Sequence, residues 1–192
     1  MEFRRNTGRS GNTRPPLDHA KSEEEFRKMG IPIYKPYDET VACPLRITYG
    51  SFMVQAFELP HNGTPNYGFL ITVGNQKILY MTDFEYCQYV FKKQQVNHIL
   101  IECNYIPELV DRDIPNYEHK LRGHCSLPTC LDFIKSNKTD ALRTVILCHL
   151  STENADAEEM IAEVSKVTGN SVTVDYAAAG KCWELRSDDC PF

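Results

Sequence analysis

Three strand-like runs in this chain each lead into one residue that can bind a metal ion. VQAFELP leads into His61, QKILYMT into Asp83, and TVILC into His149, and turn-forming residues follow each. A sheet holds its strand ends rigidly, so side chains at those ends can converge on one point. A single strand-end histidine is more often only hydrogen-bonded. Three such residues in one chain favour a metal site over three separate turn residues.

The same runs predict a layered α/β fold. HILIEC and TVILCHL are almost continuously apolar, which is typical of strands covered on both faces. A Gly74-Asn75 turn between two runs indicates a hairpin. Capping pairs, Ser22 with Glu25 and Asp156 with Glu159, open two predicted helices. The expected strands are 45–49, 52–59, 67–74, 76–82, 97–102, TVILCHL, SVTVDY and KCWELR, and the expected helices are 22–29, 84–93, 127–136 and 155–168.

Length and composition exclude several classes of protein. At 192 residues one domain is expected, and a content of 42% hydrophobic and 24% charged residues is ordinary for a globular protein. No run approaches the roughly 18 apolar residues of a membrane span. The polar, basic first residues do not form a signal peptide, so we expect a cytoplasmic protein without a membrane partner. A net charge of -5 argues against a general nucleic-acid coat but allows a small phosphate-binding cleft.

The eight cysteines are scattered and form no Cys-x-x-Cys pair. In a reducing compartment such residues are expected to be small buried hydrophobes. A structural zinc cluster is the alternative, although its spacing matches no strong zinc-finger pattern. Its members would be His119, His124, Cys125 and Cys130.

Four motifs in order carry a family resemblance: HNGTPNYGFLITVGNQKILYMTD, ILIECNY, RGHCSLPTCLDFI and ILCHLSTENAD. Together they resemble the metallo-β-lactamase superfamily, and in particular its small bacterial and phage hydrolases of the phosphodiesterase or exonuclease type. The resemblance implies an αββα sandwich over residues 18–192, behind a polar N-terminal arm at 1–17. Independently of the resemblance, 104–124 reads as a long loop, and a loop of about twenty residues in a compact domain is more often functional than idle.

The signature of that superfamily, His-x-His-x-Asp-His, is only half present. In TRPPLDHAKS, Asp18 and His19 fit the final pair, whereas Arg14 and Pro16 stand where the two histidines belong. Neither a guanidinium nor a proline can bind a cation. Only a dozen polar residues precede the motif, so we expect an incomplete sandwich that lacks the strands of its first half. The pair could also belong to a flexible arm, and Asp18 could simply cap a helix.

The resemblance implies a centre for one divalent metal ion. Its ligands would be Asp18, His19, Asp83 and His149, with His61 left over from a second site. Two imidazoles and two carboxylates suit zinc, manganese or iron, of which zinc is our first choice. A bound ion can lower the pKa of its water toward ~7. The resemblance therefore also implies a catalytic role for Asp18 and Asp83, which would bind that ion.

Three further residues could bind substrate. His124 and Ser126 stand at a predicted helix start, where an imidazole and backbone amides can hold a phosphate oxygen. Their alternatives are a surface loop histidine and a helix cap, and Asn154 could be no more than a helix-start residue. The expected ligand is a phosphate-containing small molecule or a nucleic-acid end.

Two function classes follow from these residues. The first is a metal-dependent hydrolase of phosphodiester bonds. The second is a catalytically impaired or inactive protein of the same fold, acting as a binding or regulatory module or arising as a truncated gene product. Thioester or lactam hydrolysis is also open, since a fold does not fix its substrate. Missing early strands would leave a sheet edge uncovered, so a homodimer is possible.

Overall fold

The computed structural model describes residues 22–36, 45–113 and 117–185, and the chain divides into two compact units, Met1–Lys35 and Pro36–Phe192. The first unit contains helix α1 (Glu23–Lys28), which confirms the helix expected near 22–29. The expected capping box is wrong, because the Ser22 side chain makes no cap hydrogen bond. Glu23 instead pairs with Arg27 at 2.9 Å and with Lys35 at 2.8 Å.

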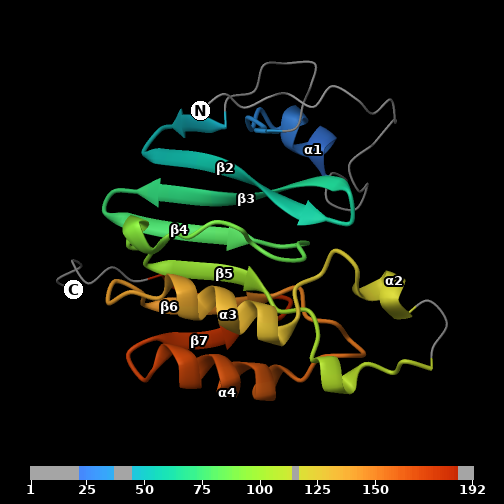
Figure 1. The fold of residues 1–192 in the computed structure, drawn as a ribbon. Coiled ribbons are helices and arrows are strands. Elements are labelled where there is room, and N and C mark those ends of the chain that lie inside the picture. Colours follow the sequence, from blue (N-terminus) through green and yellow to red (C-terminus); the bar gives the residue numbers. More distant parts are fainter. Residues whose placement is uncertain (1–21, 37–44, 114–116, 186–192) are drawn as a thin grey trace, which may run out of the picture. The chain divides into compact units, whose positions relative to one another are not determined.

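The second unit is built on one seven-stranded sheet whose strands follow the chain order (Figure 1). The first four strands are antiparallel, and β4, β5, β6 and β7 are parallel to one another. The α/β class predicted from the sequence is therefore confirmed, and the described residues form this sheet alone. Its strands are β1 (Arg46–Tyr49), β2 (Phe52–His61), β3 (Thr64–Val73), β4 (Gln76–Met81), β5 (His98–Glu102), β6 (Thr144–Cys148) and β7 (Thr173–Tyr176).

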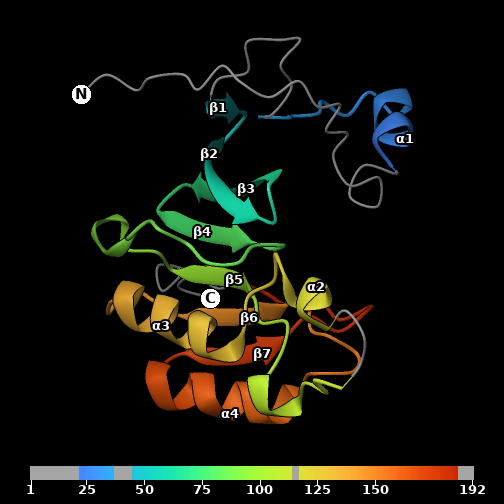
Figure 2. The same ribbon diagram turned by 45° about the vertical axis from the view of Figure 1, so that its right-hand side comes forward.

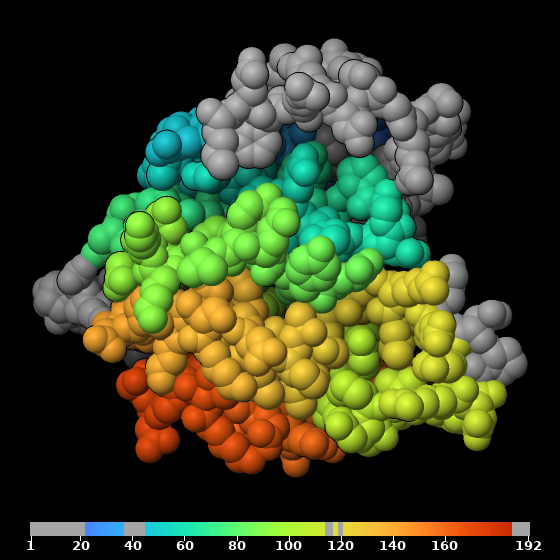
Figure 3. Space-filling model, in the orientation of Figure 1, coloured from blue at the N-terminus to red at the C-terminus, as the bar shows by residue number. Residues whose placement is uncertain are grey.

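Helices α3 (Leu127–Asn137) and α4 (Ala157–Thr168) lie on the same face of the parallel strands, as both ribbon views show (Figures 1 and 2). They pack against each other, and α4 also packs against β7. Figure 3 shows the two helices covering this face in space-filling form. Each begins at a predicted cap: Ser126 Oγ accepts from Thr129 N at 3.3 Å, and Asp156 Oδ1 accepts from Glu159 N at 3.0 Å.

The central strands are buried on both faces, as their apolar runs indicated. In β5, Ile99 and Ile101 are buried on one face and His98 and Glu102 on the other, and in β6 Val145, Ile146 and Leu147 are all buried. Two carboxyl-terminal strand ends, those of β5 and β6, are in direct register, since Glu102 pairs with Cys148. Polar side chains at these ends are therefore neighbours.

Two expected elements are wrong. Residues 84–93 do not form a helix, and only a 3₁₀ turn, η1 (Lys92–Gln94), lies there. Phe84 and Phe91 are instead separately anchored in the core, with their backbone N–H groups bonded to side chains of Glu102 and Asn137. Over 181–185 no strand forms among the described residues.

In place of a strand, the Trp183 and Lys181 side chains bond to Asp175 on β7, at 3.0 and 2.7 Å. The predicted long loop contains two short elements, a 3₁₀ turn, η2 (Pro107–Leu109), and α2 (Tyr117–Leu121). The predicted loop therefore contains secondary structure, and α2 directly precedes the turn that leads into α3.

Candidate metal centre

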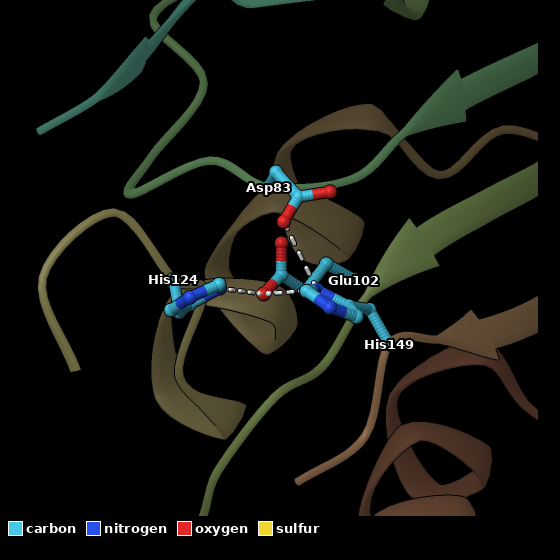
Figure 4. A group of neighbouring side chains, drawn as sticks. All are labelled: Asp83, Glu102, His124 and His149. Carbon is cyan, nitrogen blue, oxygen red and sulfur yellow. Dashed lines mark hydrogen bonds and ion pairs between the residues drawn. The ribbon is translucent and has the colours of Figure 1, made fainter. Parts of the chain in front are cut away.

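Four side chains meet at the carboxyl ends of the parallel strands: Asp83, Glu102, His124 and His149 (Figure 4). One potential ligand atom from each lies within 4.8 Å of the other three. In open α/β sheets this edge is where ligands bind. We call these four residues the metal group.

Three of the four come from neighbouring parallel strands. Asp83 follows the end of β4 at Met81, Glu102 is the last residue of β5, and His149 comes directly after β6. His124 reaches the same point from the turn between α2 and α3. The parallel pairing of β4, β5 and β6 therefore assembles the group from distant parts of the sequence.

Glu102 is the centre of the group and is fully buried, with 0% exposure. Its Oε1 accepts from Nδ1 of His124 at 2.7 Å and lies 3.3 Å from Nδ1 of His149, while Oε2 accepts from the backbone N of Phe84 at 3.1 Å. Burial alone would raise the pKa of this carboxyl. The hydrogen bonds from the two histidines outweigh burial and hold the pKa of Glu102 below its ordinary value.

Asp83 and His149 both adopt a left-handed backbone conformation, each with φ of 54°. Non-glycine residues rarely occupy this region, which costs roughly 1–2 kcal/mol per residue. Such strain persists where the surroundings fix it, and it is concentrated at functional sites. The strand ends turn sharply at these two positions, and the turn aims both side chains at Glu102.

The spacing of the donor atoms fits a small divalent ion. Bonds of about 2.1 Å to a tetrahedral ion place neighbouring ligand atoms about 3.4 Å apart. His149 Nδ1 is 3.4 Å from Asp83 Oδ1 and 3.3 Å from Glu102 Oε1. The shorter 2.7 Å contact of His124 with Glu102 is a hydrogen bond, so one of these two side chains would shift slightly to bind the ion. A candidate divalent-metal site is therefore present.

The group is open to ligands on one side. The side chain of His149 is 43% exposed, whereas that of Glu102 is 0% exposed. The carboxylate thus forms the floor of the site, and the imidazole of His149 stands at its mouth. A water molecule or a substrate oxygen can reach an ion held there without passing through the core.

The residues predicted as metal ligands have different positions. Asp83 and His149 lie in the metal group, and Asp18 and His19 lie outside the described residues. His61, at the end of β2, is a neighbour of the group rather than a member. Its Nδ1 is 2.8 Å from the carbonyl oxygen of Gly123, and its ring centroid is 5.6 Å from that of His124.

The residues predicted to bind substrate are also separated. His124 lies in the metal group itself, whereas Ser126 caps α3. Asn154 uses its backbone, because its N–H donates to Ser151 Oγ at 3.1 Å and its carbonyl oxygen accepts from Ile106 N.

Glu102 was not among the predicted site residues. The sequence did carry a signal for it, a carboxylate at the end of an apolar run, since charged groups are seldom buried without partners.

A cavity of about 400 Å³ lies at the β2–β3 hairpin. Among its lining residues are His61, Thr64, Asn66 and Tyr67. The Asn66 amide also bonds to the backbone carbonyl of Asp83, so one side chain touches both the cavity and the metal group.

The cysteines of the described part are free, and Cys103, Cys125, Cys130 and Cys148 are buried. The prediction of small buried hydrophobes is thus confirmed for these four. Burial raises the pKa of the Cys148 thiol to about 11. Within the described ranges, the metal group is the one set of donors with metal-like spacing, and Cys125 and Cys130 do not form another.

Comparison with solved structures identifies the fold. The chain is similar to the metallo-β-lactamase fold protein YhfI from Bacillus subtilis, with a TM-score of 0.56 and 21% identity over 85% of this chain and 62% of that one. The chain therefore has a metallo-β-lactamase fold, as its motifs indicated, and spans 62% of the length of YhfI.

Weaker matches include unliganded yeast PDE1, at a TM-score of 0.49 and 15% identity over 69% of this chain and 45% of that one. Zinc-bound PqqB from Methylobacterium extorquens matches at 0.42 and 15% identity, over 66% of this chain and 48% of that one. No family model and no curated protein matches the sequence. Among the described residues, no helix is long and apolar enough to span a membrane.

Proposed function

We propose that this protein is a metal-dependent hydrolase acting on phosphodiester bonds in a nucleotide or at a nucleic-acid end. The observation that carries the proposal is the metal group: two imidazoles and two carboxylates at the ends of three parallel strands, with spacing that fits a zinc-sized ion. Zinc is the expected ion, and manganese or iron would suit the same ligands.

An ion held by these donors would supply Lewis-acid stabilisation and a water of lowered pKa. The protein's own residues would orient the histidine rings that bind the ion. Nδ1 of His124 donates to Glu102, which fixes that ring, whereas Nδ1 of His149 faces both Asp83 and Glu102 and would be the nitrogen that binds an ion there. His149 is the more exposed of the two, so it is suited to the ion at the mouth of the site.

An anionic substrate is supported by the surroundings of the metal group. His61 lies beside His124 of the group, with ring centroids 5.6 Å apart. Nδ1 of His61 donates to Gly123 O, so a protonated His61 would also offer Nε2–H to a phosphate oxygen. The cavity beside His61 gives room for the rest of a small ligand. The motif resemblance to phosphodiesterase-type hydrolases agrees with this choice.

The second candidate is a binding or regulatory module without turnover. One observation favours it: the Glu102 carboxylate already accepts hydrogen bonds from three donors without any ion. A group so satisfied can serve as a stable structural network. The two candidates differ in whether the protein retains a metal ion.

Elemental analysis of protein purified without chelator tests the proposal. We expect about one equivalent of zinc, manganese or iron per chain, lost in Asp83→Ala and His149→Ala and retained in the exposed control Asp132→Ala. With the ion present, bis-(p-nitrophenyl) phosphate should release nitrophenol, and the two metal-group variants should not catalyse this release. A folded, metal-free protein that cannot be loaded with any of the three ions would refute the hydrolase and favour the binding module.

A further inference from the structure

Two asparagine side chains hold the backbone of the two strained residues in the metal group. Asn66, on β3, donates from Nδ2 to the carbonyl oxygens of Thr82 at 2.9 Å and Asp83 at 2.5 Å. Asn104, just after β5, donates from Nδ2 to the carbonyl oxygen of His149 at 2.7 Å. The residues that receive these bonds at the site, Asp83 and His149, are the two with φ of 54°.

The position of Asn66 explains why a side chain is needed there. In the β3–β4 ladder Phe69 pairs with Tyr80, and continuing that register places Asn66 opposite Asp83. At Asp83 the chain turns away from β3, so the backbone can no longer supply the ladder hydrogen bond. The Asn66 amide reaches further than a backbone N–H and satisfies the carbonyls that the turn has exposed.

Asn104 performs the same task on the other side of the site and joins three segments. Its backbone N–H donates to Cys125 O at 2.7 Å, and its carbonyl oxygen accepts from Ser151 N at 2.8 Å. Cys125 directly follows His124, and the side chain of Asn104 bonds to His149. One residue therefore fixes the backbone that carries both histidines of the metal group.

We propose that Asn66 and Asn104 are positioning residues that set the ion-binding geometry of the metal group by clamping the backbone of Asp83 and His149. The inference rests on the proposed function, because it assumes that these two residues bind a cation. Without the clamps the strained turns can relax, and the carboxylate and imidazole move away from the ion. Residues that orient metal ligands in this way typically contribute about 10- to 100-fold to affinity.

Asn97 provides a matched control at the opposite end of the same strands. Its Oδ1 accepts from Lys77 N at 2.9 Å, and its Nδ2 donates to Ala141 O at 3.3 Å. It is an asparagine that bridges backbone segments, as the other two are, but it precedes β5 and lies away from the metal group. Loss of its amide removes comparable hydrogen bonds without touching the site.

The test is titration of metal-free protein with Co²⁺, followed by visible absorption, which reports both affinity and coordination geometry. Asn66→Ala and Asn104→Ala should each bind about tenfold more weakly, with a changed spectrum, whereas Asn97→Ala should bind as the wild type does. Urea unfolding of the metal-free proteins should show a similar loss of stability in all three variants. If an alanine variant does not fold, Asn66→Ser or Asn104→Ser, whose shorter side chains cannot span the gap, should show the same loss of affinity.

The outcomes separate the two proposals. Wild-type affinity and an unchanged spectrum in the Asn66 and Asn104 variants would overturn the clamp while leaving the metal centre intact. An equal loss of affinity in Asn97→Ala would also overturn it, because the effect would then be one of general stability. A wild-type protein that binds no Co²⁺ would overturn both the clamp and the proposed metal-dependent function.

Discussion

Replacing Glu102 with glutamine should destabilise the metal-free protein substantially, although the two side chains have nearly the same shape. The amide keeps one acceptor for Phe84 N but cannot accept from both histidines as Oε1 does. Hydrogen bonds to charged groups contribute about 1.5–3 kcal/mol. Assigning about 2 kcal/mol to the 2.7 Å bond from His124 and about 1 kcal/mol to the 3.3 Å bond from His149 gives a loss near 3 kcal/mol.

The direction of this change follows from the pKa of Glu102. A buried carboxylate can be more costly than a neutral group, and its removal is then neutral or stabilising. Here the pKa lies below its ordinary value, so the histidine hydrogen bonds outweigh the cost of burial and the folded state favours the ion. The neutral amide should therefore be the worse residue at neutral pH.

Urea unfolding in the presence of a chelator measures the difference, with thermal unfolding as a second readout. For a chain of this size, 3 kcal/mol corresponds to a fall in Tm of roughly 6–12 °C. Glu163→Gln is the control, because Glu163 pairs with Lys166 at the surface and its replacement should change stability by less than about 0.5 kcal/mol. An equal urea midpoint for Glu102→Gln and wild type would refute the reasoning.

The pH dependence of the same pair of proteins gives an independent check. A carboxyl whose folded pKa is lowered contributes stability that is complete above its unfolded value, near 4.5, and is lost as the pH falls through the folded value. The stability difference between wild type and Glu102→Gln should therefore persist above about pH 4.5 and shrink below it. A difference that grows on acidification would contradict the assignment.

Three further outcomes are expected. Gly123→Ala should displace His61 and reduce stability, because its Cβ would lie 2.5 Å from His61 Nδ1 at a position with φ of 87°; a crystal structure or the urea midpoint of the variant would show this. Asp156→Ala should cost about 1 kcal/mol through loss of the α4 cap, measured by urea unfolding, and no measurable change would contradict the cap. Ellman's reagent at pH 8 should label exposed Cys182 well before buried Cys148, because burial raises the pKa of the Cys148 thiol to about 11. Mass spectrometry of the labelled peptides measures the two rates, and equal rates would contradict the burial.

The sheet was predictable because its strands carry strong local patterns. The hairpin around Gly74 and the apolar runs of β5 and β6 are each determined by adjacent residues, and the structure has them at the predicted places. The helix expected at 84–93 failed because Phe84 and Phe91 are held by contacts far along the chain, which imitate a helical spacing. Local pattern and tertiary anchoring cannot be told apart from such a short segment.

The metal group was predictable only in part for the same reason. Asp83 and His149 could be recognised because each follows its own strand. The role of Glu102 depends on donors from three separate segments, and nothing adjacent in the sequence shows that they meet there. His124 was recognised as a site residue, but whether its ring faces a phosphate or a carboxylate is determined by the position of β5 relative to the turn before α3.

Parallel pairing of β4, β5 and β6 also determines when the metal group can exist during folding. Each crossover between these strands closes a long loop, and such non-local contacts form late and slowly. An unfolded chain would hold Asp83 and His149 too far apart to share an ion, so a cation that prefers this group would bind the native state almost exclusively. The Tm of the native sheet should then rise with metal concentration, since a ligand of the folded state alone stabilises it by mass action.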